Sequence, residues 1–466
     1  MSGLMGSLQI ALGALQADQA GLSVTSNNIS NINTPGYTRQ RADLVENQPL
    51  EMGNILYGNG VSLSRIESLR DDVLEQRIAN ETQQQTQTQS YLAPMQQAEA
   101  MFNDASGTGL QSAISAFFNS FTQLSTDPSS TPLRQSALTA AQDLADSFNQ
   151  SSTSLTTIQD SLDQQVSADV GQINNLSAQI AQLNTEITQV PQGVSGADML
   201  IDQRAYLVQQ LSGLIGVQTS NTNTGALNVS TANGIALVAG QQSFDITAQT
   251  NPTTGHQDVY GQDEDITSYI TGGDLGGTIQ ARDQGIAGAL SQLDTLATAI
   301  ANQVNTVNQN GLDATGAAGG LFFNTPTPTN AAANMSVSIT DPSKIAAAAV
   351  PVPPAVFAVG DNTNALALAN IQNQTIVDNE TPIDYYSDFV SGVGNEVSGA
   401  SAENSSQTMV LNQLQQQLSS VSGVSLDEEA VNLIQFQRGY EASARVISTV
   451  DSLTSTAINL GNSGGS

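Results

Sequence analysis

The sequence predicts a mainly α-helical protein with β insertions: paired terminal helices that form a coiled coil, a long helical bundle, and a small inserted β domain or domains. Three observations carry this prediction. Apolar residues recur every seven positions at both ends of the chain. Few helix-breaking residues interrupt the stretch from Thr131 to Val190. Between residues 217 and 276 the composition changes to Gly, Thr and Asn with short alternating runs, which are typical of β-hairpins.

The N-terminal segment is predicted to be one helix with a single apolar stripe, formed by Leu8, Leu15, Leu22 and Ile29. Its opposite face is polar but almost uncharged, because Asp18 is the only charged side chain before Pro35. A solvated helix normally carries charge on its outer face. The neutral face therefore favours burial against neighbouring subunits that can hydrogen-bond it.

The C-terminal segment repeats this spacing with Leu426, Leu433, Tyr440 and Ile447. Ser425 and Glu428 have the spacing of a capping box at its start. Two matching stripes at opposite ends indicate that the termini pair with each other and that the rest of the chain is inserted between them. On spacing alone, each helix could instead cover a globular core of its own.

A polar run connects the first helix to the middle of the chain, and its residues are Asn27, Asn28, Ile29, Ser30, Asn31, Ile32, Asn33, Thr34, Pro35, Gly36 and Tyr37. The asparagines can cap the helix end and hydrogen-bond local backbone, and Pro-Gly predicts a turn of type II. An extended run to Arg41 should come next. From turn chemistry alone, a simple loop is the competing interpretation.

The middle of the chain is predicted to be helical from 71 to about 103, with Pro94 as a kink or break, and again from 109 to 125 and from 131 to 190, the last spanning roughly 90 Å. A further helix ends near Leu214, and helical periodicity returns at 277–309 and beyond 363. The predicted domains are a terminal coiled coil (1–35 with 426–466), a helical bundle (36–216 with 277–310 and 363–425), an inserted β domain (217–276), and a turn-rich, strand-like segment (311–362) that belongs to that β domain or forms a second insertion.

Both ends of the chain resemble one protein family. The run from Asn27 to Tyr37 resembles the N-terminal signature of the flagellar rod, hook and hook-associated axial proteins, and the run from Gly423 to Ala430 with Leu433, Phe436 and Tyr440 resembles their closing segment. Rod and hook proteins continue from the motif mainly in β structure, whereas this chain is expected to continue in helix. The helical middle, with Asp202-Gln203-Arg204 and Gly311-Leu312-Asp313, is more similar to the hook-associated junction proteins of the family.

The resemblance implies a structural subunit of the bacterial flagellum that joins hook to filament. The implied partners are the hook protein, a second junction protein, further copies of the chain in a helical ring, and an export chaperone that binds the C-terminal segment. The implied location is extracellular, reached without a cleaved signal peptide. A flagellin-like filament subunit, another rod or hook protein, and an adhesin with coiled-coil ends are the alternatives.

Composition excludes several kinds of chemistry. The chain has 42 acidic and 11 basic residues, a net charge of -31, and Lys344 is its only lysine, so a nucleic-acid-binding surface is not expected. It has no cysteine and one histidine, His256, so neither a thiolate site nor a histidine-based catalytic or metal site can be assembled. We therefore expect no catalytic residue, cofactor or metal, and no membrane insertion.

Overall fold

The computed structural model describes residues 2–52, 55–102, 109–190, 196–324, 329–353 and 356–462. The chain divides into two compact units. Unit 1 comprises Met1–Gln83, Gln172–Ile246 and Gln407–Ser466, and unit 2 comprises Gln84–Gly171 and Thr247–Ser406. The predicted fold class, mainly helical with small β insertions, is confirmed.

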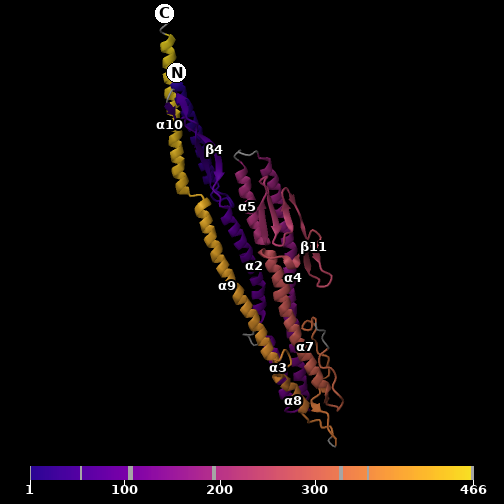
Figure 1. Ribbon diagram of the computed structural model, residues 1–466. Helices are drawn as coiled ribbons and strands as arrows, with labels where there is room; N and C mark the ends of the chain where they lie inside the picture. The colour runs from indigo at the N-terminus through magenta and orange to yellow at the C-terminus, as the bar shows by residue number, and fades with distance from the viewer. Residues whose placement is uncertain are drawn as a thin grey trace. The chain divides into compact units, whose positions relative to one another are not determined.

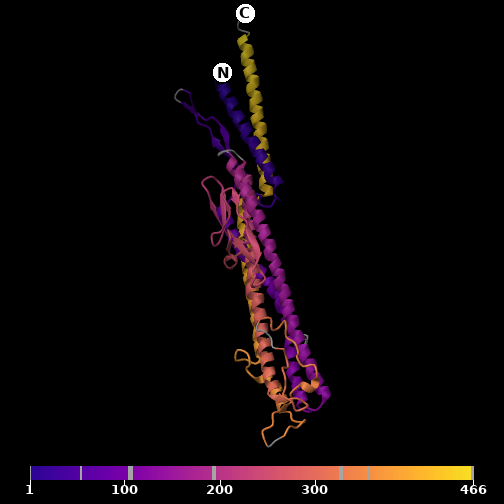
Figure 2. The same cartoon turned by 90° about the vertical axis from the view of Figure 1, so that its right-hand side faces the viewer.

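The two ends of the chain pair with each other in unit 1. Helix α1 (Ser2–Ser30) packs along α10 (Leu426–Asn462), as Figures 1 and 2 show. The helices run antiparallel, because Gly21 faces Phe436 whereas Asp18 faces Gly439. A Cβ atom on Gly21 would lie 2.6 Å from the Phe436 ring, so the small residue sets how closely the helices approach.

A β-hairpin comes after the polar run and packs on α1. Strand β1 (Gln40–Glu46) pairs antiparallel with β4 (Val61–Ser68), and β2 (Leu50–Met52) pairs with β3 (Ile55–Tyr57). We call residues 40–68 the hairpin. The expectation that the chain continues after the motif in helix and not in β structure was wrong for residues 40–68, because the alternation in Val61-Ser62-Leu63-Ser64 specifies a strand and Gly60, at φ 76°, supplies the turn before it.

The long helices lie close to their predicted positions: α2 (Asp72–Phe102), α3 (Leu110–Leu124), α4 (Thr131–Gln189), α5 (Ala197–Leu214), α7 (Ala287–Gln309), α8 (Thr363–Asn370) and α9 (Pro382–Ser422). The 59 residues of α4 span roughly 90 Å. Pro94 lies inside α2 without breaking it. Leu92, Met95 and Ala98 are buried around it, and this packing offsets the hydrogen bond that proline removes.

The core of unit 2 is built around phenylalanines. Phe117, Phe118 and Phe121 of α3 pack with Phe322 and Phe323, with ring centroids 5.1 to 5.9 Å apart among the contacting pairs. All five side chains are fully buried. The segment after α7 is therefore part of this core and is not a separate layer. Where this segment is described, its regular elements are β12 (Gly311–Leu312), η3 (Pro342–Lys344) and β13 (Ala348–Ala349). Positions 325–328 and 354–355 of the predicted turn-rich segment lie outside the described residues.

The residues predicted to be β between 217 and 276 form two small antiparallel sheets. One has the strand order β5-β6-β7-β8 and the other β11-β10-β9. The strands are β5 (Val217–Asn221), β6 (Leu227–Thr231), β7 (Ala236–Ala239), β8 (Gln242–Ser243), β9 (Ile246–Thr250), β10 (Gln257–Gly261) and β11 (Glu264–Asp265). The remaining short elements are η1 (Thr267–Tyr269), α6 (Gly273–Gln280), the π-helical η2 (Ala281–Ile286) and η4 (Ile371–Asn373).

Candidate functional site

The polar run at the end of α1 folds into a hydrogen-bonded corner, which we call the motif corner (residues 27–40). Its centre is Asn28, whose side chain is 1 % exposed. Asn28 Nδ2 donates to the carbonyl of Gln40, and the amide of Gln40 donates to Asn28 Oδ1, both at 2.9 Å. The side-chain amide thus pairs with a peptide group as a neighbouring strand would, and it joins the end of α1 to the start of β1.

The other asparagines close the helix end. Asn31 Nδ2 donates to the carbonyl and the side-chain oxygen of Asn27 at 3.0 and 2.9 Å, and Thr34 Oγ1 donates to Asn31 Oδ1 at 3.1 Å. These bonds satisfy groups that a helix terminus leaves without partners. Asn33 and Pro35 are exposed. The structure therefore brings most of the predicted motif residues into one network and leaves these two at its surface.

The turn itself has the predicted type II geometry. Tyr37 N donates to Thr34 O at 3.1 Å, and Gly36 has φ 75°. A Cβ on Gly36 would also lie 2.7 Å from Cβ of Tyr206 in α5, so glycine is required for two independent reasons.

Tyr37 completes the network. Its hydroxyl donates to Asn28 Oδ1 at 2.8 Å and accepts from Asn27 Nδ2 at 3.3 Å. Burial, together with the carboxylates of Asp202 and Glu429, raises the pKa of Tyr37 to about 12. The phenol therefore keeps its proton and remains a donor over the physiological range.

Arg39 connects the motif corner to the other end of the chain. Its Nη1 lies 2.7 Å from Glu428 Oε2, and its Nε lies 2.7 Å from Glu429 Oε1. The amide of Arg39 also donates to Ser422 O at 2.9 Å, where α9 ends. The spacing of Ser425 and Glu428 predicted a capping box. The Glu428 carboxylate binds Arg39 instead, because a guanidinium gives a stronger, charge-assisted partner than a backbone N–H.

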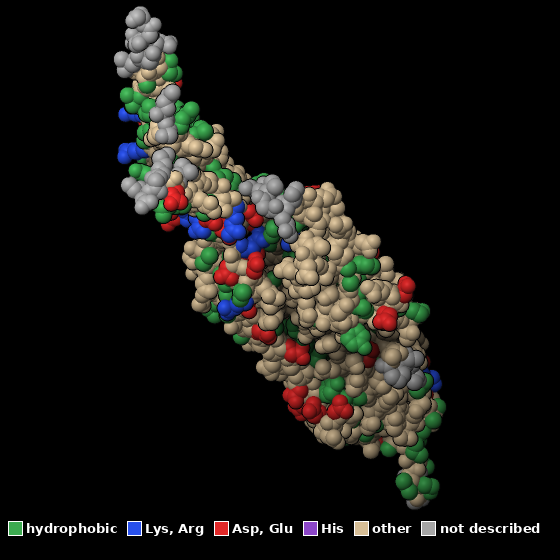
Figure 3. Space-filling model, turned by 45° about the horizontal axis from the view of Figure 1, so that its top comes forward, with side chains coloured by type: hydrophobic (Ala, Val, Ile, Leu, Met, Phe, Trp, Pro, Cys, Tyr) green, Lys and Arg blue, Asp and Glu red, His purple; other side chains and the backbone are tan. Residues whose placement is uncertain are grey.

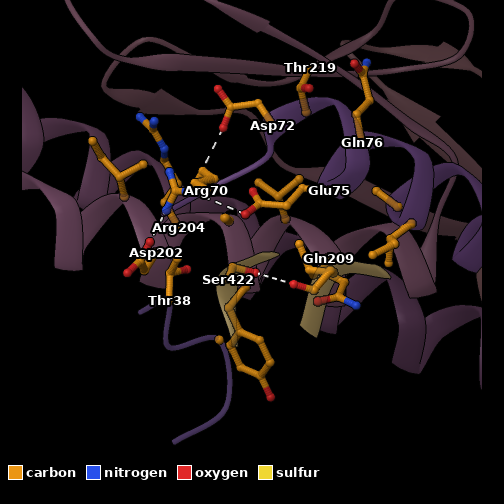
Figure 4. A pocket seen from close by; sticks show the side chains of 18 of the residues that line it. Thr38, Arg70, Asp72, Glu75, Gln76, Asp202, Arg204, Gln209, Thr219 and Ser422 are labelled. Atoms are coloured by element: carbon orange, nitrogen blue, oxygen red, sulfur yellow. Dashed lines mark hydrogen bonds and ion pairs between the residues drawn. The ribbon is translucent and has the colours of Figure 1, made fainter. Parts of the chain in front are cut away.

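A second ionic cluster lies beside the motif corner. Arg70 forms ion pairs with Asp202 of α5 and, at 3.3 Å, with Glu75 of α2, as Figure 4 shows. Thr38 also hydrogen-bonds Asp202. Burial raises the pKa of Asp202, and Arg70 opposes this shift. Burial raises the pKa of Glu75 to about 7 against the same opposing charge.

These residues border a cleft of about 410 Å³ within unit 1. Arg204 also lines it, and its Nη1 donates to Asn184 Oδ1 at 2.8 Å and to Gly225 O at 2.9 Å. Burial lowers the pKa of Arg204 to about 10. Asp202 and Arg204 were singled out in the sequence by resemblance only, and Arg39 and Arg70 were missed. The signal available in the sequence was the scarcity of basic residues. With 42 acidic residues and only 11 basic ones, each arginine is expected to have a carboxylate partner.

The eight residues of the two predicted apolar stripes, which we call the seam positions, are placed unevenly. Six are half-buried: Leu8, Leu15, Leu22, Ile29, Leu433 and Ile447. Leu426 is 53 % exposed and Tyr440 is 38 % exposed. Gly21 and Gly439 also lie in the contact between α1 and α10, against the side chains of Phe436 and Asp18. A role of the eight seam positions in assembly stays a prediction.

The described residues contain no group of three or more His, Asp or Glu side chains arranged to hold a metal ion. His256 lies in unit 2 with Nδ1 4.0 Å from Asp163 Oδ1, and Asp163 is already paired with Arg282 at 2.7 Å. Within the described part of the chain, no helix combines the length and apolar character needed to cross a membrane. The hydrogen bonds and ion pairs of the site hold separate segments of the chain together.

Figure 3 shows basic side chains next to acidic ones on the face of the molecule in view.

Comparison with known proteins shows likeness to flagellar hook-associated proteins. Residues 95–323 match the flagellar hook-associated protein FlgK helical domain. The chain is 29 % identical to flagellar hook-associated protein 1 of Bacillus subtilis over 97 % of both chains. Along nearly its whole length, this chain is similar to proteins of the FlgK family. Residues 8–38 match the flagella basal body rod protein family, and residues 415–460 match the flagellar basal body rod FlgEFG protein C-terminal family.

Other members of the FlgK family show the same extent of similarity. Flagellar hook-associated protein 1 of Salmonella typhimurium is 28 % identical, with 97 % of this chain and 99 % of that protein covered, and the Escherichia coli protein is 28 % identical, with 97 % and 98 % covered. The fold is that of the flagellar hook junction protein FlgK from Burkholderia pseudomallei, with a TM-score of 0.66 at 19 % identity over 74 % of this chain and all of that one. These matches favour the FlgK family over a flagellin-like filament subunit.

Proposed function

We propose that this chain is the structural subunit that joins the hook of the bacterial flagellum to its filament. The observation that carries the proposal is the motif corner. There the two segments that resemble axial proteins are joined, because Arg39, two residues after the first, binds Glu428 and Glu429 of the second. The ends therefore form one folded unit, as a subunit added to an existing axial structure requires.

The test is disruption of the gene followed by electron microscopy of the cells. We expect hooks without filaments and flagellin lost to the medium, with filaments restored by the intact gene. Shortened hooks or rods would place the subunit earlier in the axial series. Normal filaments would contradict the proposal.

Assembly would proceed through copies of the chain that stack helically into a ring, with the hook protein on one side and a second junction protein on the other. Contacts between different surfaces of identical subunits generate arrays of this kind. Exposed apolar residues on α10 support the proposal, since Val431, Ile434 and Leu453 are each at least half exposed in the single chain. An export chaperone that binds the C-terminal segment would cover them before assembly, and export would use no cleaved signal. Co-purification of a chaperone with the full chain, but not with one ending before Leu426, tests this part.

The subunit would act by holding surfaces together and not by catalysis. The ionisable residues of the site support this, because Arg39, Arg70 and Asp202 are all engaged in ion pairs within the chain. A net charge of -31 also disfavours binding to nucleic acid.

A further inference from the structure

Helix α10 has two apolar faces, and only one of them is covered in the chain. Its inner face packs on α1. Its outer face carries Val431, Ile434, Val446 and Leu453, which are 64, 50, 46 and 51 % exposed. Spacings of three to four residues or their multiples place these side chains on one side of the helix. A helix that is apolar on both sides is normally buried between neighbours.

Two basic residues interrupt this outer face. Arg438 and Arg445 are exposed and stand seven positions apart, about two helical turns. Among the ion pairs found within the described residues, none involves either guanidinium, although most other arginines of unit 1 are paired. The outer face of α10 therefore presents apolar surface and two arginines that belong to no ion pair of the described residues, with the exposed Glu441 three and four positions away from them.

The hairpin presents the complementary chemistry. Leu44 and Leu63 lie directly opposite each other on β1 and β4 and are 45 and 38 % exposed. Farther along, Leu56 is 69 % exposed opposite Glu51. Glu46 shares the strand face of Leu44, because side chains alternate along a strand.

The carboxylates of the hairpin fall into two groups. Asp43 and Glu67 are paired with Arg41 and Arg65 inside the hairpin. Glu46 and Glu51 take part in none of the ion pairs that the described residues form. The hairpin thus offers exposed leucines together with two carboxylates that no basic residue of its own chain neutralises.

These two surfaces lie on opposite sides of α1. Both α10 and the hairpin pack against α1, and Figures 1 and 2 show α1 between them. Two complementary surfaces on opposite sides of one unit cannot meet within a chain. They can meet between copies, and the resulting head-to-tail contact extends into an open array.

We propose that the hairpin of one copy packs on the outer face of α10 of the next copy, with Glu46 and Glu51 beside Arg438 and Arg445. The occupant of the apolar face is a second copy of this chain. The inference rests on the proposed function in requiring an assembled state, and it specifies which surfaces form the contact.

A charge exchange in the full chain tests the pairing. Arg438→Glu with Arg445→Glu places four negative charges at the contact, and Glu46→Arg with Glu51→Arg places four positive ones. Each pair of changes should lower the number of filaments per cell at least about tenfold, since like charges brought together at an interface strongly weaken binding. All four changes together restore opposite charges, and the number of filaments should return toward that of the unchanged chain. Filament numbers no better with four changes than with two would overturn the proposal.

Two controls separate the contact from other effects. Asp160→Arg with Glu264→Arg makes the same change in net charge as Glu46→Arg with Glu51→Arg, at exposed sites of unit 2, and should leave filament numbers unchanged. Thermal unfolding of each purified variant, measured by circular dichroism, should match the unchanged chain. The fourfold variant contains both pairs of changes. If either pair acted by unfolding the chain, the fourfold variant would not recover its filaments.

Cross-linking gives a readout that does not depend on where in the flagellum the subunit sits. The chain has no cysteine, so Glu46→Cys with Arg438→Cys introduces the only two thiols. A short bismaleimide added to assembled material should produce a ladder of linked copies, whereas Glu264→Cys with Arg438→Cys should not. If gene disruption leaves filaments intact but the ladder forms, the proposed function fails and the contact stands. Hooks without filaments on disruption, combined with no ladder, would leave the function standing and refute the contact.

Discussion

At the scale of single residues, the motif corner depends on one amide. Asn28 is the only side chain of the motif that bonds both the N–H and the C=O of Gln40, and it also accepts from Tyr37. A carboxylate could not donate to the carbonyl, and an alkyl side chain could do neither. The amide is required because both functions are needed at one buried position.

Asn28→Ala should therefore loosen the corner. It leaves the peptide groups of Gln40 without partners in a buried place, at a cost of about 2 to 4 kcal/mol. Amide hydrogen exchange of the purified chain should show faster exchange in α1 and β1. Asn33→Ala is the matched control, because Asn33 belongs to the same motif but is exposed, and it should change nothing. Equal exchange in both variants would show that the network does not hold the corner together.

A second residue-scale prediction concerns pH. Asp169 of α4 is fully buried, and its Oδ2 has no hydrogen-bond partner among the described residues. Burial, and after it the charge of Asp274, raises its pKa to about 7. Because the folded pKa exceeds the unfolded one, the folded state holds the proton more tightly, so stability falls as pH rises from about 4 to about 7.

Asp169→Asn should remove this loss, which amounts to at most about 4 kcal/mol above pH 7. Urea unfolding at pH 5 and pH 8 measures it. The difference between the two pH values should shrink in the variant relative to the unchanged chain. Asp160→Asn, at an exposed position of the same helix, should leave the difference as it was. The same pH dependence in all three chains would count against a buried, protonated Asp169.

At the scale of elements, the packing of α1 on α10 depends on two glycines, each of which makes room for a side chain of the other helix. The helices approach where Gly21 meets Phe436 and Gly439 meets Asp18. Small residues at a crossing allow two helix backbones to come close, and larger neighbours then pack around them. The leucines of the repeat lie beside these glycines, and all of them except Leu426 are half-buried.

Gly21→Val should consequently separate α1 from α10, since even its Cβ would lie 2.6 Å from the Phe436 ring. Limited proteolysis should cleave α1 sooner than in the unchanged chain. Gly6→Ala provides the contrast. Nothing lies within 4 Å of the added Cβ, so this change should stabilise the helix by up to about 1 kcal/mol. Unchanged protease resistance in Gly21→Val would mean that the crossing tolerates bulk.

The elements also show what could be predicted from the sequence. Long helices with regular spacing, such as α4, and the turn at Pro35-Gly36 obey local rules and were predicted. The hairpin was missed because β1 (Gln40–Glu46) is mostly polar or charged and shows no clear alternation, although Val61-Ser62-Leu63-Ser64 in β4 does. Arg39 with Glu428, and Arg70 with Asp202, are separated by more than 100 residues. No local pattern specifies such pairs, and one sequence by itself does not reveal them.

At the scale of the whole molecule, charge is distributed unequally along the chain. Of the 11 basic residues only Arg134, Arg282 and Lys344 lie in unit 2, which holds more than half of the 42 acidic ones. Each of the three is bound within the unit: Arg134 to backbone carbonyls, Arg282 to Asp163 and Asp283, and Lys344 to Asp313. Copies of the chain therefore repel one another through unit 2.

This repulsion predicts a dependence on salt. Purified chains should associate faster in about 0.15 M than in about 0.01 M salt, because the screening length falls from about 30 Å to about 8 Å. Charge pairs that become buried when two copies associate are screened less by salt. Light scattering at equal protein concentration measures the rate. Association that slows with added salt would show that attraction between exposed charges dominates instead.

The pairing of α1 with α10 also has a consequence in time. Nearly 400 residues separate the two helices, and a ribosome makes α1 first and α10 last. The partner of α1, and the carboxylates that bind Arg39, exist only once synthesis has passed Glu429. A chain that stops early would expose the apolar stripe of α1 and leave the guanidinium of Arg39 without those partners. The contact between the two ends thus forms only in chains whose synthesis has reached α10.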